Sequence, residues 1–429
     1  MQNRYSKLIV AVFLLLQFLI LFVFGYTPYP DCEGYMAAAS EALAQGSPYP
    51  SVRQLVDLEF VWNLGAINAV ELSLWLTGSI LPLLVVYTLL KGLTAWLVYL
   101  IMRHLSGPRV AMAALLIYVC YPANYGESTS LLSELPFVFF ILLAVYEALV
   151  ARRLLLGGML MAVANWFRPM GLVFLLALVL LLVWLVWYGK GKENNGLIYK
   201  KYAPALPIVG YVAMLLVIAT ATRCYCGRFI YQAETGWMGL MQYSWDHDTD
   251  QTSDLYLFEQ GDPMYVGEAA EVDGTVRDSR WRAHFVRWLR HGNVGEYIRQ
   301  WPKKVVMTFV SDNTTFCTFV PEKRQQDYMY DMVSLPTLAR SFPRLQAVQW
   351  LAVVNLLFYY ALLLFYVGSL WLLRRRPWQA VDVLTLAIVA LGTAVLMLAG
   401  HGESRFHQPF MPFIIMTVAQ AAVVSLRKQ

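Results

Sequence analysis

Charged residues are scarce in this chain. Asp, Glu, Lys and Arg make up 14% of its 429 residues, whereas apolar residues make up 59%, and the mean hydropathy is +0.51. A soluble domain contains about 25% charged and about 45–50% apolar residues. The excess of apolar residues therefore predicts a protein that uses the lipid bilayer as a second solvent. The net charge of +5 is modest, and the basic residues stand at the ends of apolar runs, which excludes a nucleic-acid footprint.

Several common signatures are absent as well. The chain has no Walker A motif, no dinucleotide-binding glycine pattern, no internal repeat and no low-complexity tract. Its five cysteines are an odd number and lack the spacing of a zinc site. They leave two interpretations open, which are a disulfide from Cys317 to Cys224 or Cys226 and a set of small buried thiols.

Long apolar runs are what the sequence has in abundance, and a membrane-spanning helix takes roughly 20 such residues. The first run follows Arg4 and Lys7, is longer than a signal-peptide core and has no Ala-x-Ala site after it, so we interpret it as an uncleaved span. Runs 110–123 and 154–167 are short for a span. The ten predicted spans are Leu8–Tyr26, Ser79–Met102, Val110–Ala123, Leu131–Val150, Leu154–Phe167, Pro169–Tyr188, Tyr202–Thr222, Ala347–Leu373, Trp378–Gly400 and Phe406–Leu426.

Charge predicts the orientation of these spans. Short cytoplasmic connections carry an excess of Lys and Arg. With the N-terminus in the cytoplasm, every short inside connection is basic, and the C-terminus also returns to the cytoplasm. These connections are Arg103–Arg109, Arg152–Arg153, Lys190–Lys201, Arg374–Arg376 and Arg427–Lys428. The sequence thus predicts an all-α polytopic protein of the plasma (inner) membrane with about ten transmembrane helices and both termini inside.

Two long connections fall on the outer side. The first, residues 27–78, ends in an apolar stretch, Phe60–Thr77, that we interpret as an interfacial helix because it carries Asn63, Asn68 and Glu71. The second is polar, contains two amphipathic helical patterns and holds a sequon at Asn313. We therefore divide the chain into a transmembrane module (1–222), a mixed extracytoplasmic domain (223–346) and C-terminal transmembrane helices (347–429). The helical patterns are Asp278–His291 and Asn293–Met307.

Ionisable residues at membrane depth are costly and therefore suggest function. Here they gather at the predicted outer side, although a network of structural ion pairs would produce the same clustering. Lys91, in the middle of a span, receives no role, and Asp382 and Glu147 are expected to be solvated near cytoplasmic ends. The outer group comprises Asp31, Glu33, Glu127, Glu134, Arg168, His401, Glu403, Arg405 and His407.

Asp31 stands just after the first span and before an Ala-rich helical stretch, Gly34–Gln45, that ends at Gly46. A carboxylate at this place can cap the following helix. It can also act as a general base that takes a proton from an acceptor. The local sequence leaves both interpretations open.

The order of several motifs completes the pattern. An acid after the first span is followed by Tyr35, Gly46-Ser-Pro-Tyr49, Trp62-Asn-Leu-Gly-Ala-Ile-Asn68, Ser133-Glu-Leu-Pro136, Phe167-Arg-Pro169 and Gly402-Glu-Ser-Arg-Phe406. The set resembles the GT-C superfamily of polytopic glycosyltransferases, in the branch of protein O-mannosyltransferases and lipid A aminoarabinose transferases. The resemblance covers residues 1–222 and 347–429, and the region between them carries no motif of the family.

The resemblance implies a glycosyltransferase that moves one sugar from a polyprenyl-phosphate donor to a glycan, lipid or protein acceptor on the extracytoplasmic face. It assigns Asp31 the role of catalytic base, with Glu33 as the alternative acid. The residues that the resemblance places at the donor phosphate and sugar are Arg168, Arg405, His401, Glu134 and Glu403.

No cofactor is required if arginine and histidine neutralise the phosphate, because fixed cations stabilise the charge that develops when the sugar–phosphate bond breaks. Asp31, Glu33 and Glu134 could hold Mg²⁺ or Mn²⁺ if they converge.

Three other classes of membrane protein remain compatible with the sequence. A transporter or flippase of lipid-linked saccharides would typically show inverted repeats and polar groups at the midplane. A polysaccharide polymerase or ligase would also have a large outer loop. In a non-catalytic scaffold, Asp31 and Arg405 would be structural. Replacing Asp31 by Asn distinguishes a transferase, which should lose nearly all activity, from a transporter or scaffold.

Overall fold

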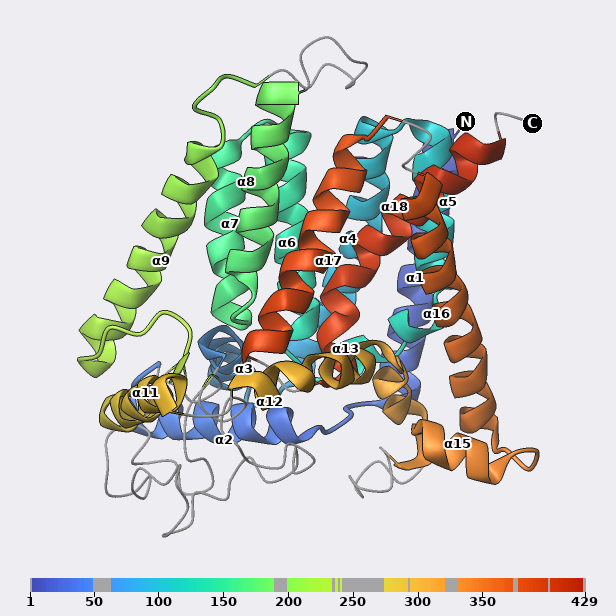
Figure 1. Ribbon diagram of the computed structural model, residues 1–429. Coiled ribbons are helices and arrows are strands. Elements are labelled where there is room, and N and C mark those ends of the chain that lie inside the picture. The colour runs from blue at the N-terminus through green and yellow to red at the C-terminus, as the bar shows by residue number, and fades with distance from the viewer. Residues whose placement is uncertain are drawn as a thin grey trace.

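The described part of the chain is helical throughout. The computed structural model describes residues 2–48, 63–188, 199–233, 236–237, 240, 274–291, 294–320, 331–372, 377–399 and 402–426, and these contain no strand. Ten helices run between the two ends of the molecule (Figure 1). They are α1 (Gln2–Phe24), α4 (Leu81–Leu105), α5 (Pro108–Cys120), α6 (Glu134–Leu149), α7 (Leu154–Phe167), α8 (Gly171–Tyr188), α9 (Ala205–Cys226), α16 (Ala347–Leu372), α17 (Ala380–Ala399) and α18 (Met411–Leu426).

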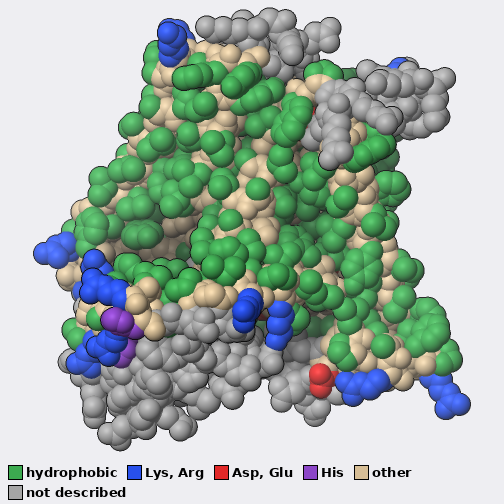
Figure 2. Space-filling model, in the orientation of Figure 1, with side chains coloured by type: hydrophobic (Ala, Val, Ile, Leu, Met, Phe, Trp, Pro, Cys, Tyr) green, Lys and Arg blue, Asp and Glu red, His purple; other side chains and the backbone are tan. Residues whose placement is uncertain are grey.

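Each of the ten predicted spans overlaps one of these helices, which confirms the all-α polytopic membrane fold. By length and composition alone, six of the described helices can cross a membrane, namely α1, α4, α8, α9, α16 and α17. The segment Pro122–Thr129 together with α6 makes a seventh candidate, bent by 113°. Hydrophobic side chains cover the middle of the molecule, while Lys, Arg and His appear toward its ends (Figure 2). This is the surface expected of a bundle surrounded by lipid.

Both termini lie at the same end of the bundle (Figure 1). Arg103 in the last turn of α4, Arg109 in the first turn of α5 and Arg152 between α6 and α7 are exposed. The described connections from α4 to α5 and from α6 to α7 lie at the end that carries the termini (Figure 1). That this end faces the cytoplasm remains a prediction from the charge pattern.

Glycines allow α7 and α9 to approach closely. A Cβ atom on Gly158 would lie 1.9 Å from the carbonyl oxygen of Pro207, and one on Gly210 would lie 2.0 Å from that of Leu155. Small residues are common where membrane helices pack backbone to backbone. The contact fixes the helix that precedes Arg168.

Residues 27–48 and 63–78, which are the described part of the first connection predicted to be outside, form two helices that lie across the end of the bundle opposite the termini (Figure 1). α2 (Pro30–Gln45) begins at a proline and ends at Gly46, whose φ of +66° suits a left-handed glycine cap. It buries an alanine face and contacts α3 (Leu64–Thr77). α3 confirms the helical character predicted for Phe60–Thr77, whose first residues lie outside the described part.

The second outer stretch covers the same end of the bundle with shorter elements. They are α11 (Gly274–His291), α12 (Val294–Arg299), α13 (Trp301–Phe309), the 3-10 helix η4 (Thr314–Phe319) and α15 (Leu335–Ser341). The pattern at 278–291 is helical as predicted, whereas the predicted single helix 293–307 is two helices that meet at Gln300. The hydroxyl of Thr318 donates to the carbonyl oxygen of Gly126 at 3.0 Å, so η4 packs directly on the bundle.

The sequon residue Asn313 is buried, and its Nδ2 donates to the carbonyl oxygen of Val333. Of the two interpretations of Cys317, a disulfide and a buried thiol, the structure supports the second. Cys317 is a buried free thiol, and Cys224 is also free. Burial raises the pKa of the Cys317 thiol to about 12, which makes it a poor nucleophile.

We predict that Lys304 on α13 makes the stability of the protein depend on pH. Burial lowers the pKa of its ammonium group from 10.5 to about 8. Between these values the unfolded chain binds more protons than the folded one, so folding becomes more favourable as pH rises from 8 to 10.5. We expect Lys304→Met to be more stable than the parent at pH 7, and the difference in melting temperature to shrink above pH 8. Equal melting temperatures at every pH would contradict this.

Candidate active site

Asp31 and Arg405 meet at the end of the bundle that is opposite the termini. Asp31 lies in the first turn of α2, and Arg405 lies on the 3-10 helix η5 (Ser404–Phe410), which precedes α18. The Nη1 atom of Arg405 donates to Oδ2 of Asp31 at 2.7 Å, across 374 residues of sequence. Tyr29, rather than Asp31, is the N-cap residue of α2. The capping interpretation of Asp31 is therefore wrong, and its carboxylate is an ion-pair partner.

Glu134 lies between two arginines. It begins α6 and its side chain is completely buried, with Oε1 2.6 Å from Nη1 of Arg168 and 3.9 Å from Nε of Arg405. Arg168 is the C-cap residue of α7, where the helix ends before Pro169. A buried carboxylate requires paired cations to offset its lost hydration. Glu134 thus joins α6, α7 and η5 into one charged cluster.

Glu403 completes the cluster. Its Oε1 pairs with Nε of Arg405, and its side chain is 31% exposed, the largest value among the five ionised groups. Burial disfavours the charged form of Arg405, but the carboxylates of Asp31, Glu403 and Glu134 outweigh that effect and hold its pKa well above the usual value. Two guanidinium groups and three carboxylates give the cluster a formal charge of −1. Arg405 is therefore cationic at every physiological pH.

The ring of Phe406 lies near both guanidinium groups. The guanidinium carbon of Arg168 lies 5.1 Å from the centre of its ring, and that of Arg405 lies 5.9 Å away. These distances are in the range of cation–π attraction. The aromatic ring lets two like charges share one small volume with Glu134.

A neutral hydrogen-bond network lies beside the cluster. Nδ2 of Asn63 donates to the hydroxyl of Tyr35 at 2.6 Å, and Nε2 of Gln232 donates to Oδ1 of Asn63 at 2.7 Å. Asn63 adopts a left-handed conformation with φ of 54° and also reaches the hydroxyl of Ser133 at 3.4 Å. Asn63 stood in a motif of the sequence, whereas no sequence signal pointed to Gln232. The network ties α2 and the start of α6 to the segment after α9.

The remaining predicted site residues have separate positions. Glu33 lies on the exposed side of α2, while Asp31 contacts Arg405. His401 lies outside the described residues. Asp31 and Glu134 converge on Arg405, and within the described ranges no group of three His, Cys, Asp or Glu side chains could hold a metal ion.

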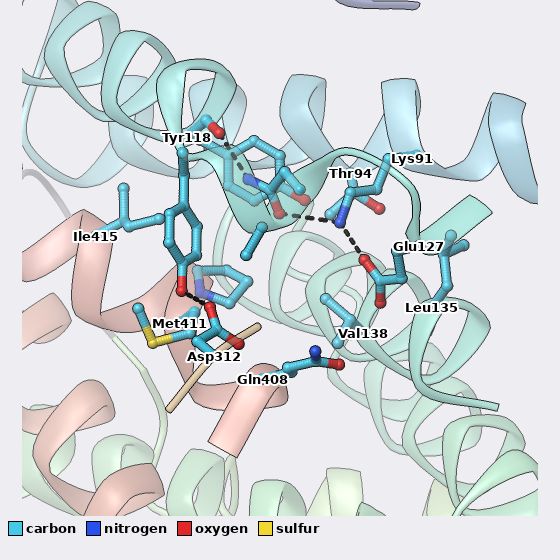
Figure 3. Close-up of a pocket in the computed structure, with 14 residues that line it drawn as sticks. Lys91, Thr94, Tyr118, Glu127, Leu135, Val138, Asp312, Gln408, Met411 and Ile415 are labelled. Atoms are coloured by element: carbon cyan, nitrogen blue, oxygen red, sulfur yellow. Dashed lines mark hydrogen bonds and ion pairs between the residues drawn. The ribbon is translucent and has the colours of Figure 1, made fainter. Parts of the chain in front are cut away.

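A second charged group lies deeper in the bundle. Lys91 on α4 is buried, pairs with Glu127 and donates to Oδ1 of Asn124 at 2.9 Å. Glu127 therefore belongs to this pair and not to the group around Glu134. The pair lines one side of a cavity of about 30 Å³, with Asp312 on the other side (Figure 3). That volume suffices for about two water molecules.

The expectation that Asp382 and Glu147 are solvated is wrong, and the Glu147 side chain is only 13% exposed. Asp382 was expected to be solvated, but it is completely buried at the start of α17. Its carboxylate accepts hydrogen bonds from the backbone N–H of Gln379 at 3.0 Å and from Nε2 of Gln420 at 3.5 Å. These contacts join α17 to α18, so Asp382 is a structural residue.

The fold and the cluster define a polytopic helical membrane protein with an acid–arginine site at one end of the bundle. No family model matches the chain, and no curated protein matches it. The crystal structure of ArnT from Cupriavidus metallidurans bound to undecaprenyl phosphate is similar, with 13% sequence identity and a TM-score of 0.38, over 98% of this chain and 78% of that one. A likeness of this size says nothing about activity, so we base the function on the residues of this chain.

Proposed function

We propose that the protein is a membrane glycosyltransferase of the GT-C type. It takes a single sugar from a polyprenyl-phosphate carrier and passes it to a glycan, lipid or protein acceptor. The observation that carries this proposal is the cluster Asp31–Arg405–Glu134–Arg168, with Glu403 on its exposed side, which four distant parts of the chain assemble at one end of the bundle. The order of motifs in the sequence supports the same assignment.

The chemistry divides between the acids and the arginines. Asp31 accepts the proton of the acceptor as its oxygen or nitrogen attacks the anomeric carbon of the sugar. The bond between that carbon and the phosphate oxygen breaks, and the electron pair leaves with the polyprenyl phosphate. Arg405 and Arg168 stabilise the negative charge that grows on the phosphate. A direct displacement of this kind inverts the anomeric centre.

The ion pairs hold the acids and arginines of the site in place. Arg405 fixes the position of the Asp31 carboxylate through a contact of 2.7 Å. An incoming phosphate exchanges places with a carboxylate on Arg405. Glu403 is the most exposed of the three carboxylates around Arg405 and is therefore the easiest to displace.

The location follows from topology and charge. The cluster lies at the end of the bundle opposite the two termini (Figure 1). If the basic connections mark the cytoplasmic side of a plasma membrane, the site faces the extracytoplasmic side. A lipid-linked donor reaches such a site from the outer leaflet.

Replacing Glu403 by Gln tests the exchange on Arg405. An ion pair with access to solvent contributes about 0.2–1 kcal/mol, so removing this partly exposed competitor should strengthen binding of polyprenyl phosphate by roughly 1.4–5-fold. Binding is measured with the purified protein in detergent. Glu134→Gln is the comparison variant, because Glu134 is buried and its replacement should lower the stability of the fold. Weaker binding by Glu403→Gln would show that this carboxylate contacts the ligand, as a group for sugar hydroxyls does.

Sugar transfer by the purified protein from a panel of polyprenyl-phosphate sugars tests the function itself. We expect product with at least one donor, and the donor that reacts names the sugar. Lack of turnover together with lack of polyprenyl-phosphate binding would contradict the proposal. Movement of the intact lipid-linked saccharide across a vesicle membrane, without transfer, would favour a flippase.

A further inference from the structure

His407 is a buried titratable residue that the proposed reaction does not use. It lies on η5 two residues after Arg405 and is completely buried. Its ring stacks between two aromatic side chains, with centroid distances of 5.6 Å to Phe309 and 5.0 Å to Tyr359. The position and the plane of the imidazole are therefore fixed by packing.

Both nitrogen atoms of this ring face oxygen acceptors. Nδ1 lies 2.7 Å from the carbonyl oxygen of Thr308, and Nε2 lies 3.3 Å from Oδ1 of Asp312. A carbonyl oxygen can only accept, so Nδ1 carries a proton. Nε2 and Oδ1 lie within ion-pair distance, so the imidazole of His407 and the carboxyl group of Asp312 are buried partners.

Both oxygens of the Asp312 side chain have buried partners. Asp312 is buried, its Oδ1 faces His407, and its Oδ2 accepts a hydrogen bond from the hydroxyl of Tyr121. Across the cavity, Lys91 pairs with Glu127 (Figure 3). A buried carboxylate is costly unless it is paired. His407 and Tyr121 are therefore the partners of Asp312, as Lys91 is the partner of Glu127.

The pair anchors a segment with little stability of its own. η5 is a 3-10 helix of seven residues with Pro409 inside it. Such helices have poor hydrogen-bond geometry and are short for that reason. The contacts of His407 join η5 to Thr308 on α13 and to Asp312 after it. Arg405 lies on the same short segment, and its side chain contacts Asp31 and Glu134.

We propose that His407 is a positioning residue for Arg405. Its two polar contacts hold η5 in the register that brings the guanidinium group between Asp31 and Glu134. The kinetic test of this role rests on the proposed transferase function, and a second readout is independent of that function.

A double-mutant cycle supplies the kinetic test. The variant His407→Phe/Asp312→Asn keeps an aromatic ring in the stack and removes both titratable groups, so that no buried carboxylate is left alone. A misplacement of about 1 Å can cost roughly 100-fold in rate, and we expect a loss of that order in kcat/KM. His407 acts through Arg405 in this proposal. The triple variant His407→Phe/Asp312→Asn/Arg405→Lys should therefore have the same kcat/KM as Arg405→Lys alone.

Two further variants make the test specific. Asp312→Asn alone can still accept from Tyr121 and donate to a neutral His407, so it should keep kcat/KM close to that of the parent. Thr385→Val removes two buried hydrogen bonds between α17 and α18 and should leave kcat/KM unchanged. Parental kcat/KM in His407→Phe/Asp312→Asn, or losses that multiply with Arg405→Lys, would overturn the proposal.

Amide hydrogen exchange distinguishes failure of the proposal from failure of the transferase function. Exchange across residues 404–410 should accelerate by at least about 10-fold in His407→Phe/Asp312→Asn and not in Thr385→Val, since local opening becomes easier when anchors are removed. This holds even if the parent transfers no sugar. Unchanged exchange in η5 would overturn the positioning role.

Discussion

Replacing Asp31 by Asn should lower kcat for sugar transfer by roughly 10²–10⁴-fold, which is the usual contribution of a general base. Asn has nearly the same shape but accepts no proton. It also loses its charge-assisted contact with Arg405, which lies 2.7 Å from Asp31 in the parent. The variant should therefore bind polyprenyl phosphate at least as well as the parent while it fails to transfer. Initial rates are compared at equal folded yield.

Glu33→Gln is the matched control for this experiment. Glu33 lies two residues further along α2 and is exposed, whereas Asp31 is partly buried against η5. We expect Glu33→Gln to keep most of the parental kcat. A loss in Glu33→Gln with full activity in Asp31→Asn would reverse the assignment of the base. Full activity in both variants would remove the base mechanism altogether.

Replacing Lys91 by Met should destabilise the protein by about 3–5 kcal/mol, the cost of leaving one member of a buried ion pair alone. Lys91 and Glu127 are both buried near the small cavity of Figure 3. In Lys91→Met the carboxylate of Glu127 loses its cation, and the side-chain oxygen of Asn124 loses a hydrogen-bond donor. Unfolding in a graded denaturant series in detergent measures the difference.

The double variant Lys91→Met/Glu127→Met tests whether the pair itself is required. Apolar replacement of a whole buried pair is often neutral or stabilising, so the double variant should recover most of the stability that Lys91→Met loses. A double variant as unstable as the single one would show that the charges organise the packing around them. A stable Lys91→Met variant would mean that water in the cavity already hydrates Glu127.

The sequence by itself determined the membrane architecture. A bilayer imposes a length and a polarity on each segment separately, so Leu8–Tyr26 or Ala347–Leu373 can be recognised as a helix without knowledge of its neighbours. The position of the polar residues along the bilayer normal follows from the same length and polarity of each segment. Asp31, Glu134, Arg168 and Arg405 were expected near one end of the bundle for this reason, and the ion pairs bring them together there.

Only the tertiary structure decided which charges are partners. Lys91 looked isolated because its partner Glu127 stands 36 residues further along the chain. Asp382 looked solvated because nothing in its own segment shows that α18 covers it. The pairing of Asp31 with Arg405 and the enclosure of His407 also join distant segments. Hydropathy is a property of each segment alone, whereas an ion pair depends on how two helices pack, and that information is not local.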